Sequence, residues 1–294
     1  MKKTTVKDAS GRYELTGETW KIGKTVVYRI RALKPFTAGK NGRIPVWKGR
    51  LGGFVSDLDR ISGNAWVMED AVVMGQARLM DNSVVSGGAV VKGNAVLFDN
   101  SYVGGGAVVS GNARLSDDST VDGFARISGS ALVSGSAYVL DDAEVSGRAE
   151  VGCRAVVRGN AKVLKRAIVT GSAQVEGNAE ITDYALIDDV AEVRDQVKVG
   201  GNTIVAGKAN LTGDAVVMED FDFTVYMNTW SSGRYVTYTR SNGMWRAGCF
   251  HGTGEELVAK ARLDGKLSGK CYAELVKFQK RIDAIRAECA AGSK

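Results

Sequence analysis

Small and aliphatic residues recur with a period of six along more than half of the chain. Ala or Ser stands at every sixth position from Ala65 to Ala215, and only Val197 and Thr203 depart from this rule among 26 units. Two residues after each of these positions the chain always has Val, Leu or Ile, with no insertion or deletion. Such a repeat must be recognised first, because it determines the whole fold.

Each six-residue unit predicts a turn followed by a short strand. Gly or Asp usually precedes the small residue by two positions, which is typical of turns with unusual backbone angles. A strand this short cannot bury itself, so the units must stack as a solenoid with parallel strands paired between coils. Three units make one triangular coil with the aliphatic side chain inside. The repeat therefore predicts about nine coils and a shaft about 40 Å long.

The residue between the small and aliphatic positions points outward, and residues 18 apart should be vertical neighbours. The first face carries Val72, Val90, Val108, Arg126, Glu144, Lys162, Glu180, Lys198 and Val216. The second face carries Trp66, Val84, Tyr102, Thr120, Tyr138, Val156, Gln174, Glu192 and Asn210. The third face carries Arg78, Val96, Arg114, Leu132, Glu150, Ile168, Leu186 and Ile204. The alternating charges of the first face predict a ladder of exposed ion pairs between coils, which fixes register more than it stabilises.

Outward apolar residues on the second and third faces form the predicted interaction surface. They are Trp66, Tyr102 and Tyr138 on the second face and Val96, Leu132, Ile168, Leu186 and Ile204 on the third. Ile168, Leu186 and Ile204 make a contiguous strip, and we expect the terminal domain or another subunit to cover it. The alternative is that these residues are good strand formers on a tolerated surface.

The segments that flank the repeat predict caps, because a solenoid exposes strand edges and core at both ends. The repeat itself occupies residues 61–220. Residues 1–60 predict an N-terminal β-hairpin cap, with strands at 13–22 and 25–33 joined at Gly23-Lys24.

Residues 221–294 predict a small α+β module with three strands and two helices. The strands are expected at 221–230, 235–240 and 244–250. Thr253 and Glu256 are spaced as a capping box that opens the first helix, which Asp264-Gly265 ends. Apolar residues at helical spacing then predict a longer second helix.

Two segments carry a resemblance to a known family. The run Leu51-Gly-Gly-Phe-Val followed by Ser62-Gly-Asn-Ala-Trp-Val, and the segment from Val236 to Leu257, resemble bacteriophage and prophage hexapeptide-repeat proteins. That family is similar to the YdcK-like group, whose acyltransferase label rests on fold analogy. The resemblance implies an all-β-dominated chain built on a single-stranded left-handed parallel β-helix of about nine triangular coils. It also implies a homo-oligomer, a trimer or a dimer.

The chain contains a single histidine, His251, in the C-terminal module. Three-His zinc sites and HExxH proteases are therefore excluded within one chain. Acyltransferases of the resembled fold typically use a histidine on or near the coils and bind their donor beside extruded loops, whereas this repeat contains neither. We expect His251 to be a turn residue near the helix cap. A catalytic base, alone or paired with Cys249, is the alternative.

No metal or cofactor is predicted. The four cysteines have no CxxC spacing and are expected to be reduced thiols. Asp81, Asp99 and Asp117 stack 18 apart, but the nine-residue pattern of calcium-binding β-rolls is absent, so we interpret them as turn formers. The glycines at 104–106 have no following Lys and open no helix, so they do not indicate a phosphate-binding loop.

Charge is distributed unevenly along the chain, whose net charge is +6. Residues 1–60 hold 14 Lys and Arg against 5 Asp and Glu, and residues 221–294 hold 12 against 7, whereas the repeat is acidic. Basic caps are typical of proteins that bind nucleic acid or an acidic partner, but no nucleic-acid-binding motif accompanies them. We therefore prefer the interpretation that they are scattered lysines on solvated hairpins, with nucleic acid binding as the alternative. An export signal and a membrane-spanning stretch are both missing from the sequence, so we expect a cytoplasmic protein without a membrane partner.

Two functions fit these observations. The first is a non-catalytic phage or prophage interaction or scaffold protein that binds a host or viral macromolecule through its faces and its terminal module. Evasion of host defence and morphogenesis are both compatible with it, and the protein would act in the bacterial host during infection or lysogeny. The second is an acyltransferase-like enzyme that uses His251 at a subunit interface.

Overall fold

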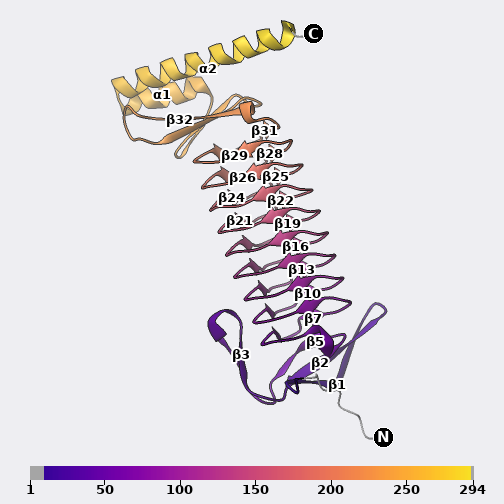
Figure 1. The fold of residues 1–294 in the computed structure, drawn as a ribbon. Coiled ribbons are helices and arrows are strands. Elements are labelled where there is room, and N and C mark those ends of the chain that lie inside the picture. Colours follow the sequence, from indigo (N-terminus) through magenta and orange to yellow (C-terminus); the bar gives the residue numbers. More distant parts are fainter. Residues whose placement is uncertain (1–9, 293–294) are drawn as a thin grey trace.

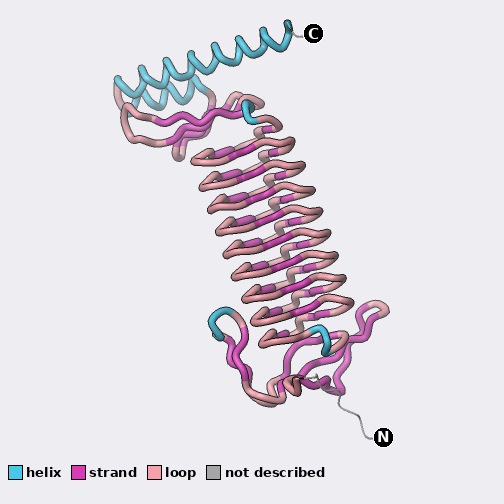
Figure 2. Tube along the Cα trace, in the orientation of Figure 1, coloured by secondary structure: helices cyan, strands magenta, loops and turns pink. Residues whose placement is uncertain are grey.

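The computed structural model describes residues 10–292, and it has three parts arranged end to end (Figure 1). An antiparallel N-terminal module leads into a parallel β-solenoid, and a small sheet with two helices follows at the far end. Figure 2 shows that the shaft consists of short strands and turns, whereas the long helices lie in the terminal module. Within residues 10–292, none of the helices combines the length and apolar character that a membrane crossing requires.

Three walls of stacked two-residue strands form the shaft. The first face consists of β7 (Val72–Val73), β10 (Val90–Val91), β13 (Val108–Val109), β16 (Arg126–Ile127), β19 (Glu144–Val145), β22 (Lys162–Val163), β25 (Glu180–Ile181), β28 (Lys198–Val199) and β31 (Val216–Val217). The second face consists of β6 (Trp66–Val67), β9 (Val84–Val85), β12 (Tyr102–Val103), β15 (Thr120–Val121), β18 (Tyr138–Val139), β21 (Val156–Val157), β24 (Gln174–Val175), β27 (Glu192–Val193) and β30 (Asn210–Leu211). The third face consists of β8 (Arg78–Leu79), β11 (Val96–Leu97), β14 (Arg114–Leu115), β17 (Leu132–Val133), β20 (Glu150–Val151), β23 (Ile168–Val169), β26 (Leu186–Ile187) and β29 (Ile204–Val205).

Each shaft strand pairs in parallel with the strand one coil further on. Val90 is opposite Val108, and Leu186 is opposite Ile204, so each residue pairs with its equivalent three repeat units later. The prediction of about nine stacked coils, each made of three repeat units, is therefore confirmed.

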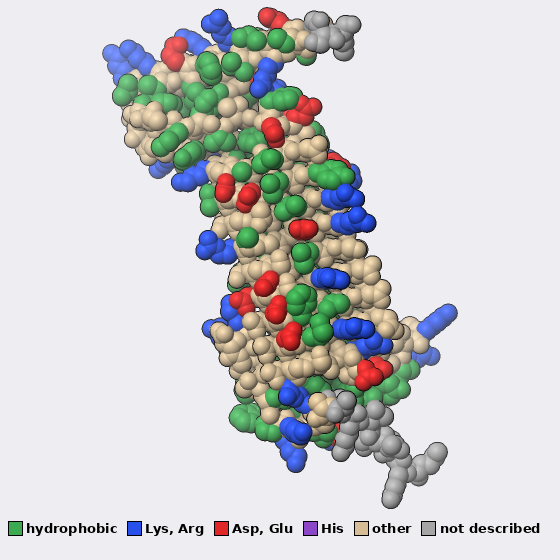
Figure 3. All heavy atoms as spheres, in the orientation of Figure 1, with side chains coloured by type: hydrophobic (Ala, Val, Ile, Leu, Met, Phe, Trp, Pro, Cys, Tyr) green, Lys and Arg blue, Asp and Glu red, His purple; other side chains and the backbone are tan. Residues whose placement is uncertain are grey.

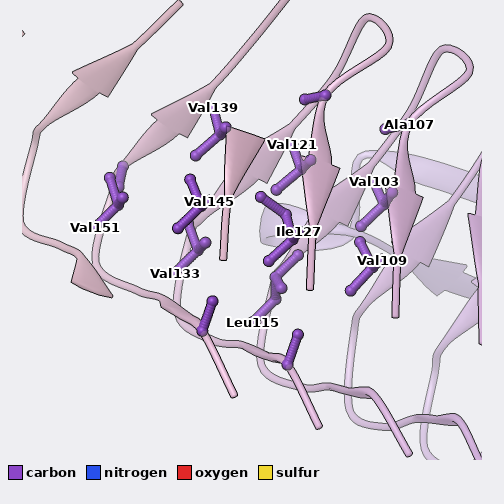
Figure 4. Close-up of a cluster of buried hydrophobic side chains, with 14 of the residues drawn as sticks. Val103, Ala107, Val109, Leu115, Val121, Ile127, Val133, Val139, Val145 and Val151 are labelled. Carbon is purple, nitrogen blue, oxygen red and sulfur yellow. The ribbon is translucent and has the colours of Figure 1, made fainter. Parts of the chain in front are cut away.

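A column of aliphatic side chains fills the interior of the shaft. Every aliphatic position of the repeat, from Val67 to Val217, is fully buried. Figure 4 shows side chains from neighbouring coils, including Val121, Ile127 and Val133, pointing into the common interior. Full burial of one such side chain stabilises the fold by about 1.5–3 kcal/mol relative to leaving it in water. Because each six-residue unit contributes one of these side chains, the core explains why the six-residue repeat is strict.

The corners between walls require a left-handed backbone. Gly105 has a φ of 59°, and a Cβ there would lie 2.5 Å from the carbonyl oxygen of Gly123 in the next coil. Where Asp replaces Gly, its carboxylate compensates: Asp99 has a φ of 55° and accepts a hydrogen bond of 3.2 Å from the amide of Asp117. Short polar residues tolerate this conformation better than other side chains.

The N-terminal module joins the first face through a continuous sheet. Strands β1 (Tyr13–Ile22) and β2 (Thr25–Ala32) form the predicted hairpin, with β2 ending one residue before the expected position. Strand β5 (Leu51–Val55) pairs antiparallel with β2 and parallel with β7. The short 3₁₀ helix η2 (Leu58–Arg60) then leads into the first coil.

A second hairpin of this module lies against the shaft, and we call it the flap. It comprises β3 (Phe36–Ala38), the 3₁₀ turn η1 (Lys40–Gly42) and β4 (Ile44–Val46). In Figure 1 it projects from the N-terminal end beside the lowest coils. The sequence analysis did not foresee this hairpin.

The terminal module has four strands rather than the predicted three. They are β32 (Phe223–Met227), β33 (Tyr235–Thr239), β34 (Met244–Ala247) and β35 (Phe250–Gly252), and the short 3₁₀ helix η3 (Asp220–Asp222) precedes them. The expected strand 244–250 is broken because Gly248 adopts a φ of 61° and starts a tight turn into β35.

Two helices pack on the terminal sheet. Helix α1 (Gly254–Asp264) begins at the predicted capping box, in which Thr253 and Glu256 each bind the other's backbone amide. Helix α2 (Lys266–Gly292) follows after Gly265. Both helices pack against Trp245 and Val236 of the sheet through a small apolar core.

Candidate interaction surfaces

The third face carries a contiguous strip of outward apolar side chains. Ile168, Leu186 and Ile204 stand in register on successive coils, whereas Glu150 separates them from Leu132. Ile168 and Leu186 are partly buried because vertical neighbours cover each other, and Ile204 is 50% exposed at the end of the row. The terminal module therefore leaves the strip open, although it lies directly beyond Ile204.

The rest of the predicted third-face surface is interrupted by charge. Val96 and Leu132 are partly buried, and the exposed Arg114 lies between them in the ladder. These two residues therefore stand apart from the contiguous strip.

Trp66 requires a correction, because it is not exposed. Its side chain has no exposed area, and Tyr13 and Phe36 pack on it with ring centroids 6.1 Å and 5.7 Å away. The residue points outward from the coil as predicted, but the N-terminal module folds back over this part of the second face. Trp66 is thus a core residue between the module and the shaft, and it is unavailable to another molecule.

The flap extends the covered part of the second face beyond Trp66, because it contacts later coils of the shaft. The amide of Gly39 donates a hydrogen bond of 3.0 Å to the carbonyl of Asn82, and Lys40 forms an ion pair of 3.1 Å with Asp118. Val84 is buried beneath the flap. This ion pair and a hydrogen bond from Asn100 lower the pKa of Asp118, and burial opposes them only partly.

The two tyrosines of the second face differ from each other. Tyr102 is partly buried, and its hydroxyl lies 2.7 Å from that of Ser86. Tyr138 is 44% exposed. Of the three aromatic residues predicted for this surface, Tyr138 alone offers a large exposed area.

The first face confirms the predicted register but not the predicted ion pairs. Arg126, Glu144, Lys162, Glu180 and Lys198 are vertical neighbours. Among residues 10–292, no ion pair within 4.0 Å joins any of these five side chains.

Ion pairs between coils form close to the corners instead. Arg158 lies 2.6 Å from Glu176, and Lys165 lies 2.7 Å from Asp183. Both pairs join equivalent positions of successive coils, as vertical stacking requires. The Lys165 ammonium and the amide of Gly201 lower the pKa of Asp183.

His251 lies on β35 at the junction between the terminal module and the last coil. Its side chain is exposed, and its Cε1 atom lies 3.0 Å from where a Cβ of Gly213 would be. Neighbouring Asp214 accepts a hydrogen bond of 3.0 Å from Asn242, which lowers the pKa of Asp214 together with a smaller effect of His251. These contacts give His251 a place in the joint with the shaft.

The described residues do not assemble a nucleophile with His251. Cys249 is an exposed thiol in the turn before β35, and no hydrogen bond joins it to the imidazole in the part of the chain that the structure describes. Nor do residues 10–292 contain a group of three or more His, Cys, Asp or Glu residues placed to hold a metal ion.

The sequence analysis missed a polar network that fixes α2 on the terminal sheet. Asp283 accepts hydrogen bonds from Tyr238 at 2.7 Å, from Arg240 at 3.0 Å and from Gln279 at 2.9 Å. Burial and the Asp283 carboxylate raise the pKa of Tyr238 well above its ordinary value. Tyr238 and Arg240 are distant from Asp283 along the chain, so no local pattern could have indicated the network.

Comparison with known proteins adds no family. No family model matches the chain, and no curated protein matches it. The architecture, a β-solenoid of about nine coils between two capping modules, therefore stands on the structure alone.

Proposed function

We propose that the protein is a non-catalytic interaction or scaffold protein of phage or prophage origin. In this proposal the shaft is a left-handed hexapeptide-repeat helix that separates two binding ends by about 40 Å. The protein acts in the cytoplasm of a bacterial host, in evasion of host defence or in morphogenesis. The sequence resemblance supports the origin and the handedness.

The third face supports self-association most directly. Ile204 stays half-exposed at the end of the Ile168–Leu186–Ile204 strip. Contiguous exposed apolar side chains are costly in water and are typical of surfaces covered in an assembly. We therefore propose a homo-oligomer, a dimer or trimer, whose subunits meet along this strip, while Tyr138 and the terminal module remain for a host or viral macromolecule.

The oligomeric state tests this proposal. Intact-mass measurement should give a dimer or trimer for the wild type and a monomer for L186E/I204E, because two carboxylates would be buried without partners. R114E is the matched control, since it changes a position on the same face that is already charged and exposed. A monomeric wild type, or an L186E/I204E variant with unchanged mass, would reject the strip as the interface.

The acyltransferase alternative rests on His251 beside the Asp214 carboxylate. A base must lie within hydrogen-bond reach of the group that it deprotonates, and this imidazole lies at the end joint of the shaft. His251→Ala should leave the oligomeric mass and any partner unchanged under the preferred proposal. Loss of an acyl-transfer activity from coenzyme A thioesters in that variant would favour the enzyme instead.

A further inference from the structure

The connection between α1 and α2 exposes two leucines at the outer end of the terminal module. Leu263 is 82% exposed, more than any other large hydrophobic side chain of residues 10–292, and Leu267 is 63% exposed. They flank Gly265, where α1 ends and α2 begins. The packed parts of both helices lie further back, at residues such as Leu257 and Val276. The leucines therefore lie outside the core of the module.

Four cations lie within three residues of these leucines in the sequence. Lys260, Arg262, Lys266 and Lys270 are all exposed, and none of them forms an ion pair with another described residue. Asp264 is the single acidic residue between positions 260 and 273. Figure 3 shows Lys and Arg side chains gathered at this end of the molecule.

The cations converge rather than scatter. Arg262, Lys266 and Lys270 line one hollow of about 660 Å³ together with Gly269, Ala273 and Glu274. Gly269 allows this arrangement, because a Cβ there would lie 2.5 Å from Cγ of Arg262. The carboxylate of Glu274 forms an ion pair with the ammonium of Lys277, with 2.8 Å between Oε1 and Nζ. The positive charge of the hollow is therefore largely uncompensated.

We propose that this leucine-and-lysine tip docks on an anionic lipid surface. Lys and Arg near such a surface each strengthen binding by about fivefold, and exposed leucines gain further by entering the headgroup region. Nucleic acid would use the cations but leave both leucines in water, and the tip has no aromatic side chain for base stacking. The contact is peripheral, and it replaces the sequence-based expectation that no membrane is a partner. It is independent of the third face.

Vesicle co-sedimentation of the full chain tests the docking. The wild type should bind vesicles of phosphatidylcholine with phosphatidylglycerol, but not phosphatidylcholine alone, and about 1 M salt should abolish the binding by screening. K266E/K270E should weaken it by about 25-fold or more, and L263S/L267S should weaken it at unchanged charge. K21E/K24E, at exposed positions of the N-terminal hairpin, makes the same charge change as a control and should bind normally.

Thermal unfolding must show that each variant is folded. We expect this result because all of the substituted side chains are exposed. Absence of binding to anionic vesicles at low salt would overturn the proposal. Equal loss in K21E/K24E would show that net charge, not the tip, is responsible. Binding that L263S/L267S leaves unchanged, together with equally tip-dependent binding of duplex DNA, would assign the tip to nucleic acid instead.

Discussion

The two ends of the shaft present opposite backbone groups, and their caps are chemically opposite. At the N-terminal end the first coil exposes carbonyl groups, and donors cover them. The hydroxyl of Tyr13 donates to the carbonyl of Ala65 at 2.8 Å. The backbone amides of Phe54 and Ser56 donate to the carbonyls of Ala71 and Val73. Arg29 binds the carbonyl of Glu69 at 3.0 Å. This end therefore uses phenol, guanidinium and amide groups.

At the C-terminal end the last coil exposes amides, and acceptors cover them. Asp220 accepts from the amide of Ile204 at 2.7 Å. The hydroxyl of Thr237 accepts a hydrogen bond of 3.0 Å from the backbone amide of Asn210, and the hydroxyl of Ser241 accepts one of 2.7 Å from the backbone amide of Val216. Each of the three faces thus ends on one oxygen-bearing side chain.

This difference follows from the parallel stacking of the coils. All amides of the walls point toward the next coil, so a parallel solenoid has a carbonyl end and an amide end. Unsatisfied backbone groups at either end would be costly and would invite pairing with another chain. The caps are consequently not interchangeable.

The largest expected effect is at the N-terminal end. Trp66→Ala should destabilise the joint between the N-terminal module and the shaft by about 3–5 kcal/mol, because it leaves a cavity beneath Tyr13 and Phe36. Chemical denaturation followed by tryptophan fluorescence measures it. The control Phe124→Ala, at a position 67% exposed, should change stability by less than about 0.5 kcal/mol. Equal effects of the two substitutions would contradict the covering of Trp66.

Removal of one capping donor comes next. Tyr13→Phe should cost about 1–3 kcal/mol, because it leaves the carbonyl of Ala65 without its phenol donor in a buried site. Thermal denaturation of Tyr138→Phe provides the control, since that tyrosine is 44% exposed and should tolerate the change. A neutral Tyr13→Phe would show that the ring alone, and not its hydroxyl, caps this end.

Alkaline pH should loosen the terminal module selectively. Burial raises the pKa of Tyr238 in the folded state, whereas the unfolded chain loses the proton near 10.0. Stability is therefore unaffected below that pH and falls above it, by about 1.4 kcal/mol per pH unit. Tyr238→Phe should reduce the slope, whereas Tyr235→Phe should not. A pH-independent melting temperature up to the alkaline limit would count against this effect.

The smallest predicted change concerns one capping acceptor. Asp220→Ala should cost about 0.5–1.5 kcal/mol, because the amide of Ile204 loses its acceptor but stays near water. Asp220→Asn keeps a carbonyl oxygen and should restore most of the loss. Thermal melts of the wild type and both variants measure this. If Asp220→Ala melted at the same temperature as the wild type, the Asp220 cap would contribute little to stability.

Local patterns were sufficient to predict the shaft. The six-residue repeat predicted the position and the register of every shaft strand, because each strand pairs with its equivalent in the next coil. The Gly23-Lys24 turn and the Thr253 capping box were likewise found from neighbouring residues. Such features depend on short sequence separations or on strict repetition.

Contacts between distant, non-repeating segments could not be predicted. The burial of Trp66 depends on Tyr13 and Phe36, which no periodicity connects to it. The bond between Tyr238 and Asp283 spans 45 residues. The charged residues of the first face show a different limit of sequence-based prediction. Their register was predicted correctly, but they form no ion pairs in the described part of the chain, because exposed side chains gain too little free energy from pairing to fix their conformations.

Residue-resolved amide hydrogen exchange tests the polarity of the two ends most directly. The amides of Ile204, Asn210 and Val216 should be protected in the wild type, and the triple variant D220A/T237A/S241A should expose these three while leaving mid-shaft amides such as that of Arg126 protected. If the three last-coil amides already exchange in the wild type as fast as those of an unstructured peptide, the C-terminal end is uncapped and the account is wrong.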